Sequence, residues 1–444
     1  MSNARSIGLG AARAMSRGTL IALLPAMYPL CLILGLIAIP AGNVLLRLGL
    51  VVAAAPGVLR LSEITPTHRR FFAVLGTYLA AVTISSLASV SPSLAFADLQ
   101  RQAFLVAVAM GLSLALADGR ARAAFALAAV AVSVAATVSI LSLYARFAGI
   151  PQLGPVQESF KAYAADKFGA FENAVSFAAV LAAALAVPYL ARRPATLVFV
   201  LLSVAIAVAA SGSRTTTVSL IAFIPLTAVF LLLHRLRRIP MWIPYGSIAV
   251  IAGWVGLTFA DQLGRLALSP ALSELTTGRS LLWAAAWGKF LERPLFGWGG
   301  GSFPIELGGF MPGTQVYTAD DLLILNTTGG AHNALLTVLA ERGVIAGLAA
   351  VVMSAFLLWL AVRVYRSRDR LHGIDRTFAW LAPFVVVLIL VRSLGESPGW
   401  FGSADGLVDI LAYGFAAMLV AVAASLDPSA EPIREPQQTR LARA

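Results

Sequence analysis

The chain is 444 residues long; 59% of its residues are hydrophobic and 12% are charged, against roughly 25% charged residues in an ordinary soluble domain. Apolar runs long enough to cross a bilayer recur from end to end, which excludes both a soluble enzyme and a soluble domain held by one anchor. The net charge of +12 does not indicate a nucleic-acid-binding protein, because the basic residues lie in short loops between apolar runs.

The first apolar run follows the arginines of segment 1–18 with no clear cleavage site, so we expect an uncleaved first helix. Cys31 lies in this run and is the single cysteine, which excludes an intrachain disulfide and a thiolate metal cluster. Further apolar runs predict an all-α polytopic membrane protein of about 12 transmembrane helices. The expected spans are 19–39, 43–59, 71–90, 103–117, 122–145, 174–191, 195–211, 216–233, 241–260, 343–364, 377–394 and 405–425.

Arginines are concentrated in alternate loops, and this bias predicts which side of the membrane is cytoplasmic. It places both termini in the cytoplasm of a bacterial inner-membrane protein. Two extended segments, 147–173 and 261–342, fall on the periplasmic side, and the second is far longer than a connection needs to be. We therefore expect four parts: helices one to nine (1–260), a periplasmic catalytic loop (261–342), helices ten to twelve (343–426) and a disordered cytoplasmic tail (427–444).

His332 is the histidine expected on the periplasmic side. It opens a segment in which Leu335, Leu336 and Leu339 follow at helical spacing, so we expect His332 to point into the protein with these leucines. Imidazole accepts a proton near neutral pH, which suits general-base work on a hydroxyl. The alternative is a core histidine with its hydrogen bonds satisfied.

Earlier in the same loop, Trp283, Trp287, Phe290 and Leu291 recur at helical spacing until Pro294. They predict an amphipathic helix on the membrane surface or against the bundle.

Arg279 would lie on the buried stripe of that helix, in its first turn. The helix dipole disfavours a cation in the first turn unless an anion is bound there. The free backbone N–H groups of that turn would bind the same anion, so Arg279 is interpreted as a phosphate ligand. The alternative is an arginine that extends to the membrane interface.

Arg214 lies at the periplasmic junction of two apolar runs, where an arginine is costly and indicates function. Arg214, Arg279 and His332 would then share one face of the membrane. Two guanidinium forks beside one imidazole match a diphosphate that leaves while a hydroxyl attacks. The glycine-dense segment 297–303 would allow close backbone approach to a ligand, but it lacks the lysine of a phosphate-binding P-loop.

Three motifs in order resemble the conserved region of the O-antigen ligase and polymerase superfamily. They are Gly278-Arg279-Ser280 with Trp283 and Trp287, then Pro294-Leu295-Phe296-Gly297-Trp298-Gly299, then His332-Asn333 with Glu341-Arg342-Gly343. The segment around Lys167 also resembles that family, although Glu172 and Ala174 depart from its usual pattern. The resemblance implies a GT-C-like membrane fold, with short amphipathic helices in the large periplasmic loop.

The resemblance also implies a metal-independent, inverting glycosyl transfer from an undecaprenyl-diphosphate-linked glycan, without a cofactor. His332 would be the general base, Arg279 and Arg214 would hold the diphosphate, and Lys167, Asn333 and Trp283 would complete the substrate site. The acids of the large loop are scattered, with no paired carboxylate beside these motifs to hold a divalent ion. They are Glu274, Glu292, Glu306, Asp320 and Asp321.

Within that superfamily the expected function is that of an O-antigen ligase, with lipid A-core as the acceptor, because the chain is short and has one dominant late loop. A polymerase that extends the glycan on its own carrier is the runner-up. From another class, a flippase for lipid-linked glycans would carry cations along a cavity at the membrane midplane. The only uncapped intramembrane cation in the sequence is Arg47, and no internal repeat suggests a transporter.

Overall fold

The computed structural model describes residues 21–36, 42–147, 172–190, 193–211, 279–305, 330–395 and 406–428. Within these residues every regular element is a helix, which confirms the all-α class. The helices are η1 (Leu24–Ala26), α2 (Met27–Leu36), α3 (Gly42–Val58), η2 (Leu61–Glu63), α4 (Pro66–Leu87), α5 (Pro92–Ala115), α6 (Gly119–Phe147), α8 (Glu172–Leu190), α9 (Pro194–Ser211), α13 (Arg279–Glu292), α15 (Ala334–Arg366), η4 (Arg368–Arg370), α16 (Gly373–Gly395) and α17 (Gly406–Ala424).

Four of the described helices are long and apolar enough to cross a membrane: 66–87, 119–139, 334–366 and 373–395. Shorter apolar helices accompany them. Together they give the chain the character of a polytopic membrane protein. The expected spans 216–233 and 241–260 lie outside the described residues, so the number of twelve stays a prediction.

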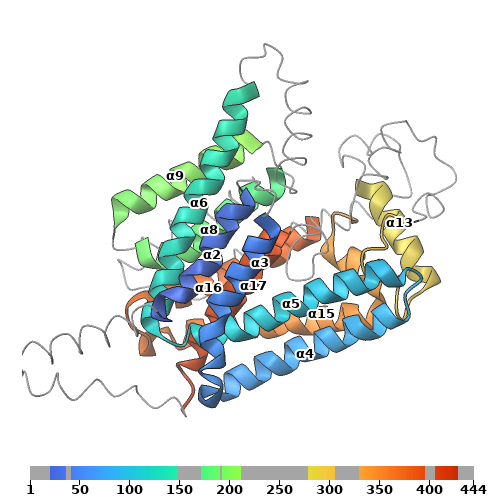
Figure 1. Ribbon diagram of the computed structural model, residues 1–444, viewed down its shortest axis with the longest axis horizontal. Coiled ribbons are helices and arrows are strands. Elements are labelled where there is room, and N and C mark those ends of the chain that lie inside the picture. The colour runs from blue at the N-terminus through green and yellow to red at the C-terminus, as the bar shows by residue number, and fades with distance from the viewer. Residues whose placement is uncertain are drawn as a thin grey trace, which may run out of the picture.

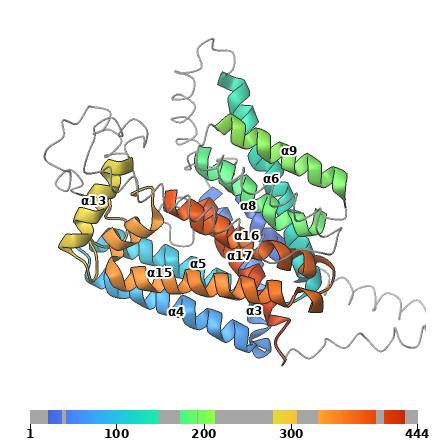
Figure 2. The same cartoon turned by 180° about the vertical axis from the view of Figure 1, so that it is seen from behind.

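The helices form two groups, and α2, α16 and α17 lie between them (Figures 1 and 2). In one group α4 packs between α5 and α15, with α3 against α5; in the other, α6, α8 and α9 pack together. Helix α17 contacts α5, α15 and α8, and its side chains are buried from Val408 to Ala424. A helix that is apolar all round belongs in the interior of a bundle, which explains this central position.

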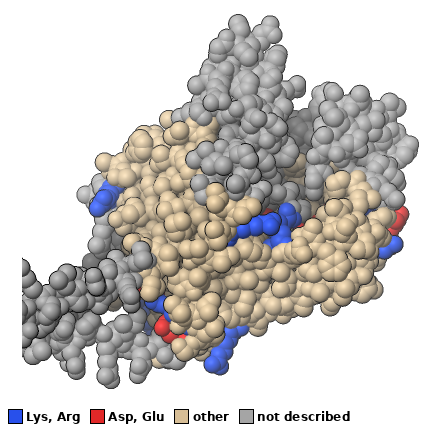
Figure 3. All heavy atoms as spheres, in the orientation of Figure 1, with Lys and Arg blue, Asp and Glu red and all other residues tan. Residues whose placement is uncertain are grey.

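Large apolar side chains are exposed on the outer helices, including Leu48 of α3, Phe199 of α9 and Val352 of α15. On the face in Figure 3, most of the described surface carries neither acidic nor basic side chains. A largely uncharged surface with exposed large apolar side chains on the outside of a helical bundle is suited to contact with lipid.

The ends of α4 mark two different ends of the bundle. Near its start, Thr67 donates to Asp427, which also pairs with Arg363 at 2.8 Å. At the same end α6 and α16 are joined by two hydrogen bonds from Arg122 to Asp375, at 2.8 and 2.6 Å. These arginines come from the predicted cytoplasmic loops, whereas the far end of α4 contacts the segment that follows α13.

Helix α15 is broken at Gly343, where the backbone has φ 71° and ψ −175°. The break separates a short first part, 334–342, from the apolar part, 344–366, which is long enough to cross a bilayer alone at about 1.5 Å per residue. Broken helices in membrane proteins are tolerated where other protein groups satisfy the freed backbone atoms. The segment after α13 supplies those groups here.

Candidate functional site

The segment that follows α13 hydrogen-bonds to the backbone of α15 on both sides of its break. The amide of Trp298 donates to the carbonyl of Ala340 at 3.1 Å, and the amide of Gly299 donates to that of Glu341 at 2.6 Å. Beyond the break, the amide of Val344 donates to the carbonyl of Pro294 at 2.8 Å. Because a helix end leaves such groups without partners, these bonds stabilise the break and fix the segment to it.

Glycine is required on both sides of this contact. A Cβ atom added to Gly297 would lie 2.4 Å from the carbonyl carbon of Glu341, and one added to Gly343 would lie 2.3 Å from the carbonyl oxygen of Leu295. Both glycines have positive φ, 68° and 71°, which disfavours other residues. The expected close backbone approach therefore exists, but α15 rather than a ligand is the partner that these two glycines face.

Lys289 holds the same segment from α13. Its side chain is fully buried, and its ammonium donates to the carbonyls of Ser302 and Phe303 at 3.0 and 3.1 Å. The ammonium also lies 4.9 Å from the ring centroid of Trp298, whose indole N–H donates back to the Lys289 carbonyl at 3.0 Å. These carbonyl oxygens and the face of the Trp298 ring stabilise the buried positive charge of Lys289 in place of water.

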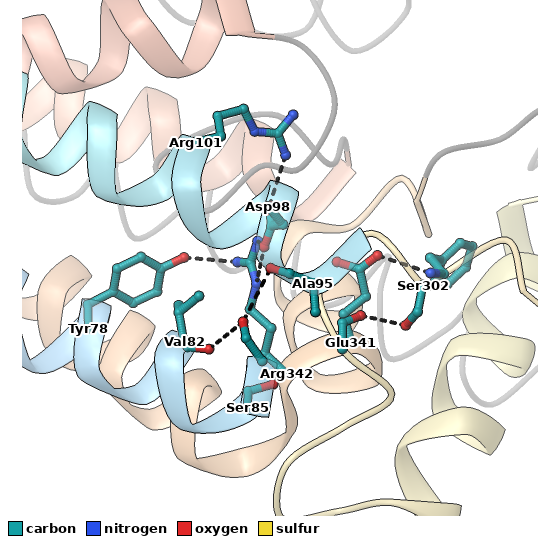
Figure 4. Close-up of polar contacts among 12 residues, drawn as sticks. Tyr78, Val82, Ser85, Ala95, Asp98, Arg101, Ser302, Glu341 and Arg342 are labelled. Atoms are coloured by element: carbon teal, nitrogen blue, oxygen red, sulfur yellow. Dashed lines mark hydrogen bonds and ion pairs between the residues drawn. The ribbon is translucent and has the colours of Figure 1, made fainter. Parts of the chain in front are cut away.

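A buried ionic cluster lies beneath the break and joins three helices (Figure 4). Arg342 of α15 donates to Asp98 Oδ2 of α5 through Nε at 3.1 Å and Nη2 at 2.6 Å. Its Nη1 donates to the Tyr78 hydroxyl of α4 at 2.9 Å. The second oxygen of Asp98 accepts from Arg101 at 2.9 Å. Neighbouring Glu341 is also buried, and it accepts from the amide of Phe303 at 3.1 Å.

His332 lies immediately before this structured region. Helix α15 begins at Ala334 with Asn333 as its N-cap, so the helical-face argument that placed His332 with Leu335, Leu336 and Leu339 is wrong. His332 instead has a positive φ of 49° and is partly buried outside the helix. Positive φ is rare for residues with a Cβ and marks a position that its surroundings hold in place.

Asn333 fixes the backbone next to His332. Its side-chain oxygen accepts from the Leu336 amide at 3.0 Å, which caps α15, and its amide nitrogen donates to the Leu394 carbonyl of α16 at 3.0 Å. The start of α15 is therefore tied to the end of α16. These two hydrogen bonds give Asn333 a structural part in placing His332, and the expected binding of substrate by Asn333 stays a prediction.

Helix α13 begins at Arg279 and ends at Glu292, which confirms the expected amphipathic helix. Its face against α15 differs from the expected stripe. Trp283 is 7% exposed, but Trp287 and Leu291 are 48% and 60% exposed. The buried positions follow the i, i+3, i+4, i+7 pattern on another side of the helix. They are Leu282, Ala285, Ala286 and Lys289.

Of the predicted site residues, Trp283 lies on α13, and His332 and Asn333 directly precede α15. Helices α13 and α15 pack against each other. Arg279 is the first residue of α13. Arg214 and Lys167 lie outside the described residues. Within the described ranges, no three His, Cys, Asp or Glu side chains gather in an arrangement that would hold a metal ion.

Sequence reasoning missed the ionic cluster because it began the span of α5 at residue 103, whereas α5 begins at Pro92. The expected span 103–117 leaves Asp98, Arg101 and Gln102 outside the helix. Their i, i+3, i+4 spacing is the signal that would have placed them together on a helix.

A family model described as O-antigen ligase matches residues 197–351. This region, 197–351, is therefore similar to the O-antigen ligase family. The match begins in α9 and covers α13, the segment against the break, His332 and the break itself, so it confirms the resemblance predicted from the motifs. Members of this family are glycosyltransferase-like enzymes that act on lipid-linked glycans. No curated protein matches the chain.

Proposed function

We propose that the protein is an O-antigen ligase that transfers a glycan from undecaprenyl diphosphate to a hydroxyl group of lipid A-core oligosaccharide. The observation that carries the proposal is the position of His332. It lies inside the O-antigen ligase family region, directly ahead of a capped helix, at the end of the bundle where Arg279 opens α13. The transfer is inverting, because the acceptor oxygen attacks the anomeric carbon opposite the departing diphosphate.

In this reaction His332 is the general base. The acceptor hydroxyl loses its proton to the imidazole as its oxygen bonds to the anomeric carbon, and the bond from that carbon to the diphosphate oxygen breaks. Asn333 supports this role because it fixes the neighbouring backbone by two side-chain hydrogen bonds. Arg279 and Arg214 hold the diphosphate and stabilise the negative charge that it gains as it leaves.

The transfer takes place on the periplasmic side of the inner membrane. The arginines of the predicted cytoplasmic loops, among them Arg122 and Arg363, lie at the start of α4, and α13 lies beyond its far end. The positive-inside rule assigns the arginine-bearing end to the cytoplasm. The opposite end then meets both the lipid-linked donor and the acceptor.

A polymerase is the second candidate, because the family suggests a ligase-type or a polymerase-type function. The two differ only in the acceptor. A polymerase moves the glycan to another carrier-linked glycan, whereas a ligase moves it to lipid A-core.

Purified protein mixed with undecaprenyl-diphosphate glycan and rough lipopolysaccharide tests the proposal. We expect a lipid A-core product heavier by the mass of the glycan, detected by mass spectrometry, and we expect the same yield in excess EDTA. A longer carrier-linked glycan without any change in lipid A-core would identify a polymerase instead. Loss of activity in EDTA with recovery in magnesium or manganese would contradict metal independence.

A further inference from the structure

Arg101 is the cation of the ionic cluster that reaches the surface. It lies on α5, one helical turn after Asp98 and just before the apolar stretch that begins at Phe104. Its side chain is 29% exposed, whereas those of Asp98 and Arg342 are 3% and 1% exposed. Figure 4 shows the Arg101 side chain directed away from Arg342.

Asp98 is shared between the two arginines, but unequally. Arg342 donates two hydrogen bonds to Oδ2, whereas Arg101 donates one to Oδ1. One carboxylate cannot neutralise two guanidinium groups, so these three side chains together keep one positive charge. Glu341, the other acid nearby, accepts from the Phe303 amide. Arg342 is enclosed, so the guanidinium of Arg101 is the part of the cluster that an anion can reach.

The guanidinium of Arg101 has hydrogen-bonding capacity to spare. A guanidinium has five N–H donors, and its fork matches the oxygens of a phosphate or carboxylate. Asp98 accepts from one of these donors, on Nη2, at 2.9 Å. Asp98 therefore orients the side chain while leaving donors for an anion.

Arg101 also lies beside the candidate site. A Cβ atom on Gly300 would come within 2.1 Å of Asp98 Oδ2, so the segment against the break touches the turn of α5 that precedes Arg101. Arg342, which shares Asp98 with Arg101, lies about 13 Å along α15 from the helix cap at Asn333, at about 1.5 Å per residue. A diphosphate with its attached sugar and lipid could therefore contact both regions.

We propose that Arg101 is a further ligand of the donor's diphosphate, binding a phosphate oxygen from the membrane side of the site. The inference rests on the proposed function, because it takes the donor to be a lipid-linked diphosphate. Asp98 is the positioning residue that holds the Arg101 guanidinium in place. A phospholipid headgroup presents similar oxygens, so the test must separate these two sources.

Native mass spectrometry of the purified protein in detergent separates the two sources of phosphate. It measures the binding of undecaprenyl diphosphate and, separately, of phosphatidylglycerol. Arg101→Gln should weaken undecaprenyl diphosphate binding about 10-fold or more, because it removes a charge-assisted contact. Arg101→Lys should recover only part of the loss, since an ammonium cannot replace the planar fork. Phosphatidylglycerol binding should change by less than about 2-fold in both variants.

The matched control is Arg376→Gln, which removes an exposed arginine from the opposite end of the bundle, where Arg376 pairs with Asp369 at 3.1 Å. Its affinity for undecaprenyl diphosphate should equal that of the wild type. Melting temperatures of all variants in detergent check folding, and a partly exposed arginine should change them little.

Each outcome decides a different point. Wild-type protein that binds no undecaprenyl diphosphate would overturn the proposed function. Wild-type binding that Arg101→Gln leaves unchanged would overturn the assignment of Arg101 alone. Weaker binding of phosphatidylglycerol with an unchanged affinity for undecaprenyl diphosphate would show that Arg101 holds a structural lipid, which also overturns it.

Discussion

Replacing His332 by asparagine should lower the turnover of glycan transfer by about 100-fold or more and leave donor binding nearly unchanged, because a general base acts on the acceptor proton. Asparagine is the informative replacement, since it tolerates the positive φ of 49° at this position better than most residues. His332→Ala should lose at least as much turnover. Single-turnover rates and undecaprenyl diphosphate affinity are the two measurements.

The control for His332 is His372→Asn, which changes an exposed histidine between η4 and α16 at the other end of the bundle. Its turnover should match that of the wild type. If His332→Asn folds normally and still transfers glycan at a near-normal rate, then His332 is a packing residue and the base lies elsewhere.

Asp98→Ala should lower the free energy of unfolding by about 3–5 kcal/mol, because it leaves the guanidinium of Arg342 buried without its carboxylate. Asp98 and Arg342 are joined at 2.6 Å with side chains 3% and 1% exposed, so water cannot replace the lost partner. Replacing both residues by apolar ones, as in Asp98→Leu with Arg342→Met, should recover most of that stability. Unfolding in mixed detergent measures the difference.

An exposed ion pair supplies the comparison for this cluster. Arg376 and Asp369 lie 3.1 Å apart with side chains 44% and 72% exposed, and Asp369→Ala should cost at most about 1 kcal/mol. If Asp98→Ala costs no more than Asp369→Ala, the buried cluster is not what holds α4, α5 and α15 together at this end.

Hydropathy predicted the helical class, and each expected span within the described residues contains a helix. The prediction succeeds because backbone N–H and C=O groups in lipid must be hydrogen-bonded internally, and a helix does this within one segment. It placed the start of α5 too late. Stretch 98–102 is mostly polar, so hydropathy does not predict a helix there. In the structure Asp98 pairs with Arg342, far along the chain, and hydropathy cannot report that contact.

The candidate site was predicted in part. The motifs identified the family and the elements that carry His332 and Arg279, and the helical pattern predicted α13. Side-chain directions were predicted less well, because Asn333 caps α15 and leaves His332 outside the helix. The close approach of Gly297 to Glu341 and of Gly343 to Leu295 joins segments that are far apart in the sequence, and no local pattern predicts it.

We propose that the end of the bundle that carries α13 and His332 faces the periplasm. Cysteine labelling in intact cells with a membrane-impermeant maleimide tests it directly, because native Cys31 is buried and can be replaced by serine. Glu292→Cys at the end of α13 and Asp369→Cys in η4 provide two exposed positions at opposite ends. We predict that Glu292→Cys is labelled in intact cells and Asp369→Cys only after lysis; the reverse pattern would contradict the account.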